Sequence, residues 1–299
     1  MNERLLNRRQ FGAQCVALAS GTLIAAQAGA QDLGTAPAVK PRTVKFPDGP
    51  VVPALGQGCW HLGQGRHAQY IEEEALRTGI DLGMTVIDTS GNYGDGLSEK
   101  VISHVISDRR ERVFLVSKVE DYEVSGDGIL HACEASLARL GTSYLDLYLL
   151  HAPVPNRLFA GVVAKFEQLR AAGKIRRWGV SNFNVEQMEA LIAVPDGQRC
   201  ATNQVLYNLS NRSIERDLLP WCDKHNMPVM AYSPLGGEEN LVLYDPMLKG
   251  LAAKNGYTTA AVALAWVMRS GNVIAIPESG SPEHVKENAA ALSIRSLSF

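Results

Sequence analysis

The sequence predicts an α/β protein built as a closed (β/α)8 TIM barrel. Two observations support this prediction. Apolar runs of strand length alternate along the chain with amphipathic stretches of helix length. The runs are almost unbroken in apolar character, which is typical of parallel strands that are buried on both faces. Such a barrel needs about 250 residues, and the chain has 299. The alternative architecture is an open, doubly wound parallel sheet.

Residues 1–30 have the pattern of an export signal, so we exclude them from the fold. Arg8 and Arg9 precede an uncharged, weakly apolar run at residues 12–30 that is rich in Ala and Gly. This pattern is typical of a twin-arginine (Tat) signal peptide and predicts a periplasmic protein with the Tat export machinery as a partner. If the arginine pair is a chance feature of an N-terminal helix, the protein is cytoplasmic. The run is too short and polar for a stable membrane span.

A linker rich in Ala and Pro is expected at residues 31–42, followed by the barrel domain at residues 43–299. Apolar runs at 43–46 and 51–53 flank the turn-forming sequence PDGP, which predicts a short N-terminal β-hairpin. The predicted barrel strands follow at residues 54–57, 85–88, 113–117, 145–150, 175–181, 202–206, 229–232 and 273–276. Helical patterns between them include residues 71–82, 129–140, 162–172, 214–225 and 259–270.

The glycines of the segment GQGCWH at residues 56–61 test the open-sheet alternative. A dinucleotide-binding fingerprint requires a third glycine and a helix directly after the loop. The third glycine is missing, and residues 62–65 have the composition of a loop. We therefore interpret the segment as the end of a barrel strand.

Composition excludes several other classes of protein. The 29 Lys and Arg residues balance 31 Asp and Glu residues and are scattered along the chain, so no nucleic-acid partner is expected. The sequence has five cysteines, of which Cys15 lies in the predicted signal peptide. The other four, Cys59, Cys133, Cys200 and Cys222, have the spacing of buried apolar residues rather than of a disulfide framework. The histidines are dispersed, so the sequence predicts no metal site and argues against a metal-dependent barrel hydrolase.

Polar side chains interrupt the ends of the predicted strands. In a (β/α)8 barrel the functional residues collect where the strands end, at one mouth of the barrel. The residues that this rule singles out are Asp88, Tyr93, Lys118, His151, Ser181, Asn182, Gln204, Tyr232 and Ser233.

Six stretches in the same regions resemble the aldo-keto reductase family, from about residue 43 to residue 288. They are IDTSGNYG at 87–94, VSK at 116–118, DLYLLH at 146–151, GVSNF at 179–183, NQVLYN at 203–208 and AYSPLG at 231–236. Their order along the chain is the order of the family. The resemblance implies an NAD(P)H-dependent reductase of small aldehydes or ketones, close to the prokaryotic branch that reduces aldehydes, 2-oxoaldehydes and diketo-gluconate.

The resemblance implies a catalytic tetrad of Asp88, Tyr93, Lys118 and His151. Negative charge builds on a carbonyl oxygen as hydride reaches its carbon, so a proton donor is needed there. Tyrosine has an ordinary pKa near 10, and a cationic Lys118 held by Asp88 would stabilise the anion that Tyr93 leaves behind. A neutral His151 is expected to orient the substrate carbonyl and donate a hydrogen bond to it. Trp60 is the second residue expected to face the substrate.

The cofactor site follows from the same resemblance, with NADP(H) as the expected cofactor. Ser181, Asn182 and Gln204 are expected to bind the nicotinamide carboxamide, and Tyr232 to lie beneath the ring. The other residues expected to contact the nucleotide are Ser233, Leu235, Glu278, Ser279 and His284. Glu287 and Asn288 match the pair that contacts the adenine in the family.

The sequence departs from the family pattern around the adenosine ribose. The family has a Lys and an Arg where this chain has Glu278 and His284. A carboxylate repels a 2′-phosphate but accepts hydrogen bonds from a free ribose diol, so NAD(H) is expected to be usable as well. In the alternative interpretation, Lys286 or the backbone amides of the following helix bind the phosphate.

The last departure is the unusually short C-terminal tail. Only residues 289–299 come after the last stretch that resembles the family, which ends at Asn288. Either an open substrate site of low selectivity is expected, or the chain is a truncated or frame-shifted product with reduced stability. The alternative function is a nucleotide-binding redox sensor or accessory subunit with little catalysis, against which the intact tetrad argues. We expect a monomer.

Overall fold

The computed structural model describes residues 42–237 and 241–295. The predicted signal peptide lies outside these residues, as does all but the last residue of the predicted linker. The described residues belong to one compact unit, Val39–Phe299. None of the described helices is both long enough and apolar enough to cross a membrane.

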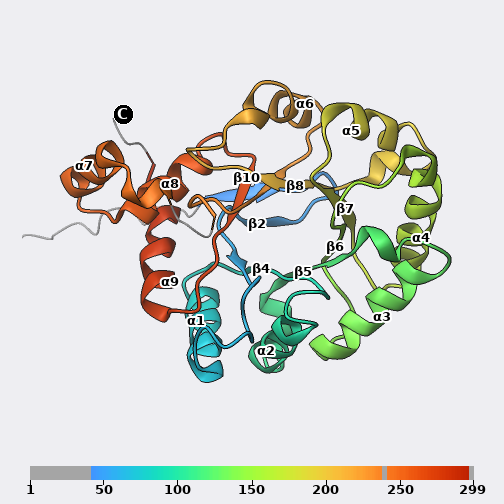
Figure 1. Ribbon diagram of the computed structural model, residues 1–299, viewed down its shortest axis with the longest axis horizontal. Coiled ribbons are helices and arrows are strands. Elements are labelled where there is room, and N and C mark those ends of the chain that lie inside the picture. Colours follow the sequence, from blue (N-terminus) through green and yellow to red (C-terminus); the bar gives the residue numbers. More distant parts are fainter. Residues whose placement is uncertain (1–41, 238–240, 296–299) are drawn as a thin grey trace, which may run out of the picture. The chain divides into compact units, whose positions relative to one another are not determined.

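Eight parallel strands pair in sequence order and form the barrel (Figure 1). They are β3 (Gln57–Gly58), β4 (Val86–Asp88), β5 (Phe114–Val119), β6 (Leu147–Leu150), β7 (Trp178–Ser181), β8 (Asn203–Leu206), β9 (Val229–Tyr232) and β10 (Val273–Ile276). The first and last strands meet, because the Gly56 amide donates to the Ala275 carbonyl at 2.8 Å and the Gly58 amide to the Pro277 carbonyl at 2.9 Å. This closure confirms the barrel and rules out the open sheet.

Close approach of the backbones explains the glycines of the segment at 56–61. A Cβ atom on Gly56 would lie 2.7 Å from the carbonyl oxygen of Val86, and one on Gly58 would lie 2.8 Å from that of Ile276. Real Cβ atoms do not approach backbone oxygen so closely, so β3 can sit between β4 and β10 only without side chains at these positions. The glycines therefore serve barrel closure.

The helices surround the barrel strands (Figure 1). They are α1 (Gln69–Asp81), α2 (Leu97–Ile106), α3 (Gly128–Leu140), α4 (Phe159–Ala171), α5 (Val185–Ile192), α6 (Leu218–Lys224), α7 (Pro246–Asn255), α8 (Thr259–Val267) and α9 (Pro282–Ala289). Short 3-10 helices lie at Arg110–Arg112, Asp121–Glu123, Asn156–Leu158, Gly197–Arg199, Ser213–Glu215, Leu241–Tyr244 and Ala290–Leu292.

The predicted hairpin is present and covers the N-terminal end of the barrel. Its strands, β1 (Thr43–Lys45) and β2 (Val51–Pro53), pair antiparallel. Phe46 stacks on Phe114, the first residue of β5, with ring centroids 5.3 Å apart. Asp48 in the turn forms an ion pair with Arg177, just before β7. Contacts with strand beginnings close this end and leave the opposite mouth for the site.

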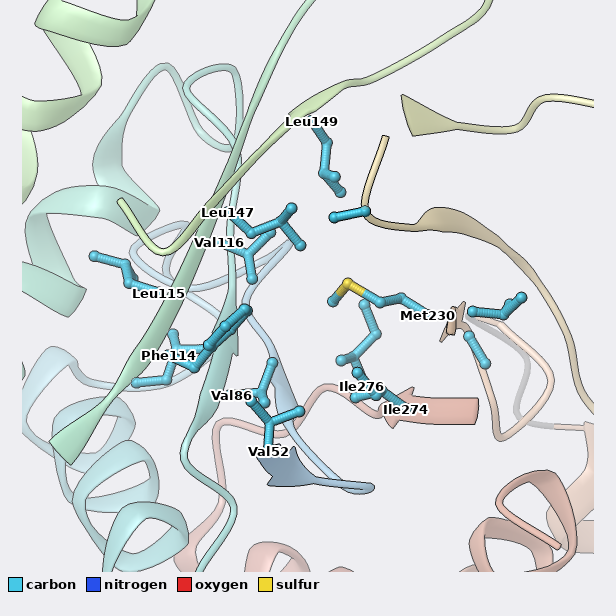
Figure 2. Packing of buried hydrophobic residues seen from close by; sticks show 14 of the residues in the cluster. Val52, Val86, Phe114, Leu115, Val116, Leu147, Leu149, Met230, Ile274 and Ile276 are labelled. Atoms are coloured by element: carbon cyan, nitrogen blue, oxygen red, sulfur yellow. The ribbon is translucent and has the colours of Figure 1, made fainter. Parts of the chain in front are cut away.

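Hydrophobic side chains fill the interior above the hairpin. Figure 2 shows buried side chains from different barrel strands converging on one another, with Val52 of the hairpin below them. The labelled residues of this cluster are Val52, Val86, Phe114, Leu115, Val116, Leu147, Leu149, Met230, Ile274 and Ile276. The packed interior supports the strand ends rigidly, which fixes the positions of the polar residues that follow them.

Candidate active site

The polar residues singled out at the strand ends meet at the C-terminal mouth of the barrel. A cavity of about 570 Å³ opens there. The predicted site residues that line it are Trp60, Asp88, Tyr93, His151, Ser181, Asn182, Gln204, Tyr232, Ser233, Leu235, Glu278, Ser279 and His284. Lys118 is buried beside it and reaches it through Tyr93. Glu287 and Asn288, on α9, are not among the lining residues, so their contact with adenine stays a prediction.

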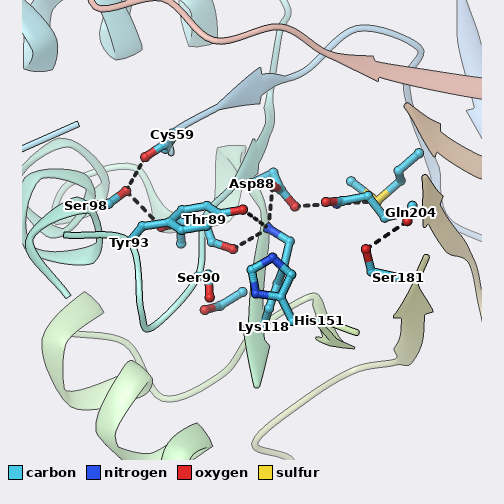
Figure 3. Close-up of polar contacts among 12 residues, drawn as sticks. Cys59, Asp88, Thr89, Ser90, Tyr93, Ser98, Lys118, His151, Ser181 and Gln204 are labelled. Carbon is cyan, nitrogen blue, oxygen red and sulfur yellow. Dashed lines mark hydrogen bonds and ion pairs between the residues drawn. The ribbon is translucent and has the colours of Figure 1, made fainter. Parts of the chain in front are cut away.

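Lys118 uses its ammonium group to tie three neighbours together (Figure 3). Its Nζ donates to Oδ2 of Asp88 at 2.6 Å, to the carbonyl of Thr89 at 2.8 Å and to Oη of Tyr93 at 3.1 Å. Burial acts to lower the pKa of Lys118, but the charge and hydrogen bonds of Asp88 and Tyr93 raise it above its ordinary value. The ammonium beside Tyr93 is therefore permanently charged at physiological pH.

Tyr93 keeps its proton at neutral pH. Burial raises the pKa of its hydroxyl above the ordinary value of 10.0, with a further contribution from Asp88, while Lys118 acts in the opposite direction. The sequence suggested Lys118 as the dominant influence on this hydroxyl; in the structure the effect of burial is larger. The result is a protonated phenol in contact with a cation, which is the state that a proton donor requires.

The loop that carries Tyr93 is held at its base by buried hydroxyl groups. Ser98 donates from Oγ to the carbonyl of Cys59 at 2.7 Å and is hydrogen-bonded to Oγ1 of Thr89 at 2.9 Å. Gly96 has a φ of 83°, a backbone conformation that favours glycine. The glycines of this loop in the sequence thus let it turn sharply from β4 into α2 and direct Tyr93 into the cavity.

His151 has a partner that the sequence analysis missed. Its Nδ1 lies 2.5 Å from Oε1 of Glu120, and Ser90 donates from Oγ to the same oxygen at 3.1 Å. Burial acts to raise the pKa of Glu120, but hydrogen bonds and charge from His151, with a hydrogen bond from Ser90, bring it below its ordinary value. Glu120 lies two residues after Lys118, and the period of a strand places such residues on one face. The two-residue spacing from Lys118 was the sequence feature that could have indicated Glu120 as a site residue.

The residues predicted to bind the carboxamide form one chain of hydrogen bonds. Tyr232 Oη donates to Oδ1 of Asn182 at 3.0 Å, and Asn182 Nδ2 donates to Oγ of Ser181 at 3.1 Å. Ser181 Oγ donates to the backbone carbonyl of Gln204 at 2.8 Å, while Gln204 Nε2 donates to Oδ1 of Asp88 at 2.7 Å. The predicted cofactor groups and the tetrad are therefore parts of one network.

Glu278 is paired across the cavity rim instead of standing alone. Its carboxylate accepts a hydrogen bond from the backbone amide of His61 at 3.2 Å and lies 2.9 Å from Nδ1 of the same residue. Trp60, which is 49% exposed, stacks on His61 with ring centroids 4.4 Å apart. Glu278 and His61 thus join the loop after β3 to the loop after β10.

Three basic residues from two separate segments also line the cavity. Arg66 and His67 come from the segment between β3 and α1, and His284 comes from the first turn of α9. Ser281 caps this helix by accepting a hydrogen bond from the backbone amide of His284. Lys286, which the alternative interpretation of the sequence assigned to the phosphate, is not among the lining residues.

The part of the chain that the structure describes contains no group of three or more His, Cys, Asp or Glu side chains arranged to hold a metal ion. Cys59, Cys133, Cys200 and Cys222 are free thiols buried in the core, which confirms the interpretation of their spacing.

The closed barrel, the cavity at its C-terminal mouth and the phenol held against a buried ammonium define a class of barrel-type carbonyl reductases. Comparison with known proteins agrees. The profile of the Aldo/keto reductase family matches residues 54–298. The chain is 47% identical to methylglyoxal reductase YeaE of Escherichia coli, covering 85% of this chain and 90% of that protein.

A solved structure gives the same result. An aldo/keto reductase from Klebsiella pneumoniae, determined in complex with NADP and acetate, superimposes with a TM-score of 0.82 at 46% identity. The match covers 87% of this chain and 92% of that one. The chain belongs to the aldo/keto reductase family. It is a nicotinamide-dependent enzyme that reduces carbonyl groups to alcohols, which confirms the prediction from the sequence.

Proposed function

We propose that this enzyme reduces small reactive carbonyls, 2-oxoaldehydes such as methylglyoxal among them, with Tyr93 as the general acid. The observation that supports this assignment is the 3.1 Å hydrogen bond from Lys118 Nζ to Tyr93 Oη at the wall of the cavity. The substrate class rests on the 47% identity to a methylglyoxal reductase.

The cavity fits a nicotinamide dinucleotide. Asn182, Gln204 and Tyr232 line it together with Tyr93, and Gln204 is linked to Tyr93 through Asp88 and Lys118. His284, from the first turn of α9, lines it as well. Because Nε2 of Gln204 is committed to Asp88, its amide oxygen is the atom that it can offer to a carboxamide. When bound, the cofactor supplies a hydride to the carbonyl carbon of the substrate.

The residues of the chain deal with the negative charge that then develops on the carbonyl oxygen. Tyr93 donates its proton to that oxygen, and the ammonium of Lys118 stabilises the phenolate that remains. Asp88 holds the ammonium in place and compensates its charge. His151, whose ring centroid lies 5.8 Å from that of Tyr93, is positioned to donate a second hydrogen bond to the same oxygen.

A spectrophotometric assay of NADPH oxidation with methylglyoxal and a panel of small aldehydes tests this function. Tyr93→Phe and Lys118→Met are each expected to lower kcat by about 10² to 10⁴-fold, the usual contribution of a general acid and its support. Wild-type activity in Tyr93→Phe would show that the proton comes from another group. No activity with any 2-oxoaldehyde in the wild-type enzyme would refute the substrate class.

The second part of the proposal is that the enzyme uses NADP(H) and also accepts NAD(H). Glu278 and His284 occupy positions where the family has cations, and the carboxylate of Glu278 faces the cavity. Arg66 also lines the cavity, and its positive charge offsets part of the repulsion between Glu278 and a 2′-phosphate. Steady-state kinetics with both cofactors decide the point, and a thousandfold or greater preference for NADPH would overturn it.

The third part concerns location. Arg8, Arg9 and the uncharged run at residues 12–30 support export of the enzyme to the periplasm through the Tat pathway. Cell fractionation tests this, with Arg8→Lys combined with Arg9→Lys as the matched variant. Periplasmic protein in the wild type and its loss in the double variant are expected, whereas cytoplasmic protein in both would leave the enzyme a cytoplasmic reductase.

A further inference from the structure

Glu120 is fixed in place from several sides. Its Oε1 lies 2.5 Å from Nδ1 of His151 and accepts the hydroxyl of Ser90, while its backbone amide donates to Oε2 of Glu123 at 3.2 Å. The residue is 8% exposed. His151 also meets Tyr93 edge to face, with ring centroids 5.8 Å apart, so the ring lies between this carboxylate and the proton donor. The geometry is that of a carboxylate–imidazole pair, in which the carboxylate orients the ring.

The ionisation of Glu120 decides where the proton of this pair lies. Although burial alone would raise it, the pKa of Glu120 is held below its ordinary value by His151 and Ser90. The carboxylate is therefore ionised at neutral pH and has no proton to donate. The hydrogen in the 2.5 Å contact must then belong to Nδ1 of His151.

That placement limits what the other ring nitrogen can do. A neutral imidazole carries one proton, so a ring protonated at Nδ1 has only a lone pair at Nε2. A lone pair faces a carbonyl oxygen repulsively and cannot donate to it. His151 can support the developing oxyanion through Nε2 only when the ring carries both protons.

We propose that Glu120 is a positioning residue that holds His151 as the doubly protonated imidazolium, so that Nε2–H donates to the carbonyl oxygen during reduction. This inference rests on the proposed function. It replaces the neutral His151 expected from the sequence with a cation paired to Glu120. In this state two cations stabilise the oxyanion. His151 contacts it directly, and Lys118 acts through Tyr93.

The charged groups around His151 are consistent with this assignment. Glu120 approaches from the end of β5 and Tyr93 from the loop after β4. Lys118 contacts Tyr93, and Asp88 pairs with Lys118. The Lys118 cation is compensated by Asp88 at 2.6 Å. Glu120 gives His151 the same kind of compensation at 2.5 Å, so each of the two cations has its own carboxylate.

The protonation state of His151 can be measured without turnover. We would label the full-length enzyme with ¹⁵N-histidine, saturate it with NADPH and record nitrogen chemical shifts between pH 5 and 10, using His151→Asn to assign the resonance. Both ring nitrogens of His151 are expected to be protonated at pH 7.5 in the wild type. In Glu120→Gln only one is expected to be protonated at that pH, because the compensating charge is gone.

A matched control exists on the surface. Glu73 on α1 lies 2.9 Å from Nδ1 of His104 on α2, and neither residue is among those that line the cavity. Glu73→Gln removes a carboxylate from a histidine in the same way and is expected to leave the His151 resonances and the activity unchanged. Glu120→Asp keeps the charge and is expected to keep His151 doubly protonated at pH 7.5.

The pH profile of kcat/KM provides a second readout. The pKa of Tyr93 is raised above 10.0, so a fall in reduction rate between pH 7 and 10 reports another group. In Glu120→Gln this fall is expected at a pH lower by about one unit or more, the size of effect that an opposite charge in contact produces. The KM for NADPH is expected to stay within about twofold, since the NADPH site is untouched.

The outcomes separate this inference from the proposed function. Tyr93→Phe is expected to lose activity while leaving His151 doubly protonated. A wild-type His151 protonated only at Nε2 at pH 7.5 would overturn the inference, and this result needs no variant to fold. An unshifted pH profile in folded Glu120→Gln would overturn it as well, even if Tyr93 proved to be the acid.

Discussion

Gln204 donates a hydrogen bond from Nε2 to Oδ1 of Asp88 at 2.7 Å, while the other oxygen of Asp88 accepts from Lys118. A residue expected to bind the carboxamide therefore also supports the group that keeps Lys118 charged. A substitution at Gln204 should for this reason disturb the proton donor as well as the cofactor site. The test is to replace the Nε2 hydrogen-bond donor of Gln204.

Gln204→Glu and Gln204→Met separate the two contributions. Methionine removes the donor and leaves a buried acceptor unpaired, which costs about 1–3 kcal/mol, or roughly tenfold to a hundredfold in kcat/KM. Glutamate adds a second carboxylate against Asp88, and like charges in contact cost several kcal/mol. Single-turnover reduction is expected to be at least tenfold slower in Gln204→Glu than in Gln204→Met at pH 8. Equal rates would show that Asp88 does not depend on this contact.

Glu278→Lys is expected to shift cofactor preference toward NADPH. The substitution removes the carboxylate that pairs with His61 and places a cation at the same wall of the cavity. One charge interaction near a protein surface is worth about 1 kcal/mol or more, so the Kd for NADPH should fall about tenfold while that for NADH changes less than threefold. Fluorescence titration with both nucleotides measures this.

The control for that titration is Glu283→Lys. Glu283 is exposed in the first turn of α9, carries the same charge change and does not line the cavity. It is expected to alter the two Kd values by less than threefold at 0.15 M salt, where exposed charges are screened. If both variants tightened NADPH binding equally, general electrostatic attraction would explain the effect, and Glu278 would not face the phosphate.

The sequence was sufficient to predict the barrel and the residues at its mouth, because strand periodicity and the position of strand ends are local properties. Contacts between side chains that are far apart in the sequence were harder to predict. His61 and Glu278 are 217 residues apart, and nothing in their spacing indicates that they meet. Glu120 was missed because a single carboxylate after Lys118 forms no motif until the fold brings His151 beside it.

Boundaries and helix orientation were also beyond sequence reasoning. The strand predicted at 54–57 is regular only at Gln57–Gly58, and Leu55 and Gly58 pair with the last strand segment through isolated bridges to Ala275 and Glu278. Asn288 is 4% exposed and does not line the cavity, so its contact with the adenine stays a prediction. Packing against α1 determines which face of α9 points inward. The eight residues of this helix do not by themselves specify that face.

Glu215 is expected to make stability depend on pH. Arg212 above all, with Tyr207 and Arg269, holds the pKa of this carboxyl at about 2 against an ordinary value of 4.5, although burial acts in the opposite direction. A depressed pKa stabilises the folded state above the unfolded value and loses that effect as pH falls through the folded value. Glu215→Gln should therefore lower the free energy of unfolding at pH 7 by about 1–3 kcal/mol, and the difference should shrink below pH 4.5.

Urea unfolding of both proteins at pH 7, 5 and 4 measures the effect. Glu74→Gln serves as the control, because Glu74 is exposed on α1 and its replacement should change the free energy of unfolding by less than about 0.5 kcal/mol at each pH. A difference between wild type and Glu215→Gln that grew on acidification would mean that the fold does not favour the ionised form of Glu215.

Gly79→Ala should destabilise the barrel even though alanine is the better helix former. Gly79 lies in α1 against β3, where an added Cβ would overlap the side-chain amide of Gln57. That amide is buried and donates to the carbonyls of Leu76 at 3.2 Å and Met84 at 3.0 Å. Displacing it leaves both acceptors and the amide unpaired, so the free energy of unfolding should fall by about 2 kcal/mol or more.

Gly161→Ala, also in a helix, is expected to raise the free energy of unfolding instead of lowering it. Gly161 is exposed in α4, and a Cβ there would meet no atom within 4 Å. Without a clash, the loss of glycine's freedom in the unfolded chain dominates, and alanine should stabilise the protein by about 0.5–1 kcal/mol. Thermal and urea unfolding of the two variants test the pair together. Stabilisation in both would mean that Gln57 can move aside without losing its hydrogen bonds, and that α1 does not depend on close contact with β3.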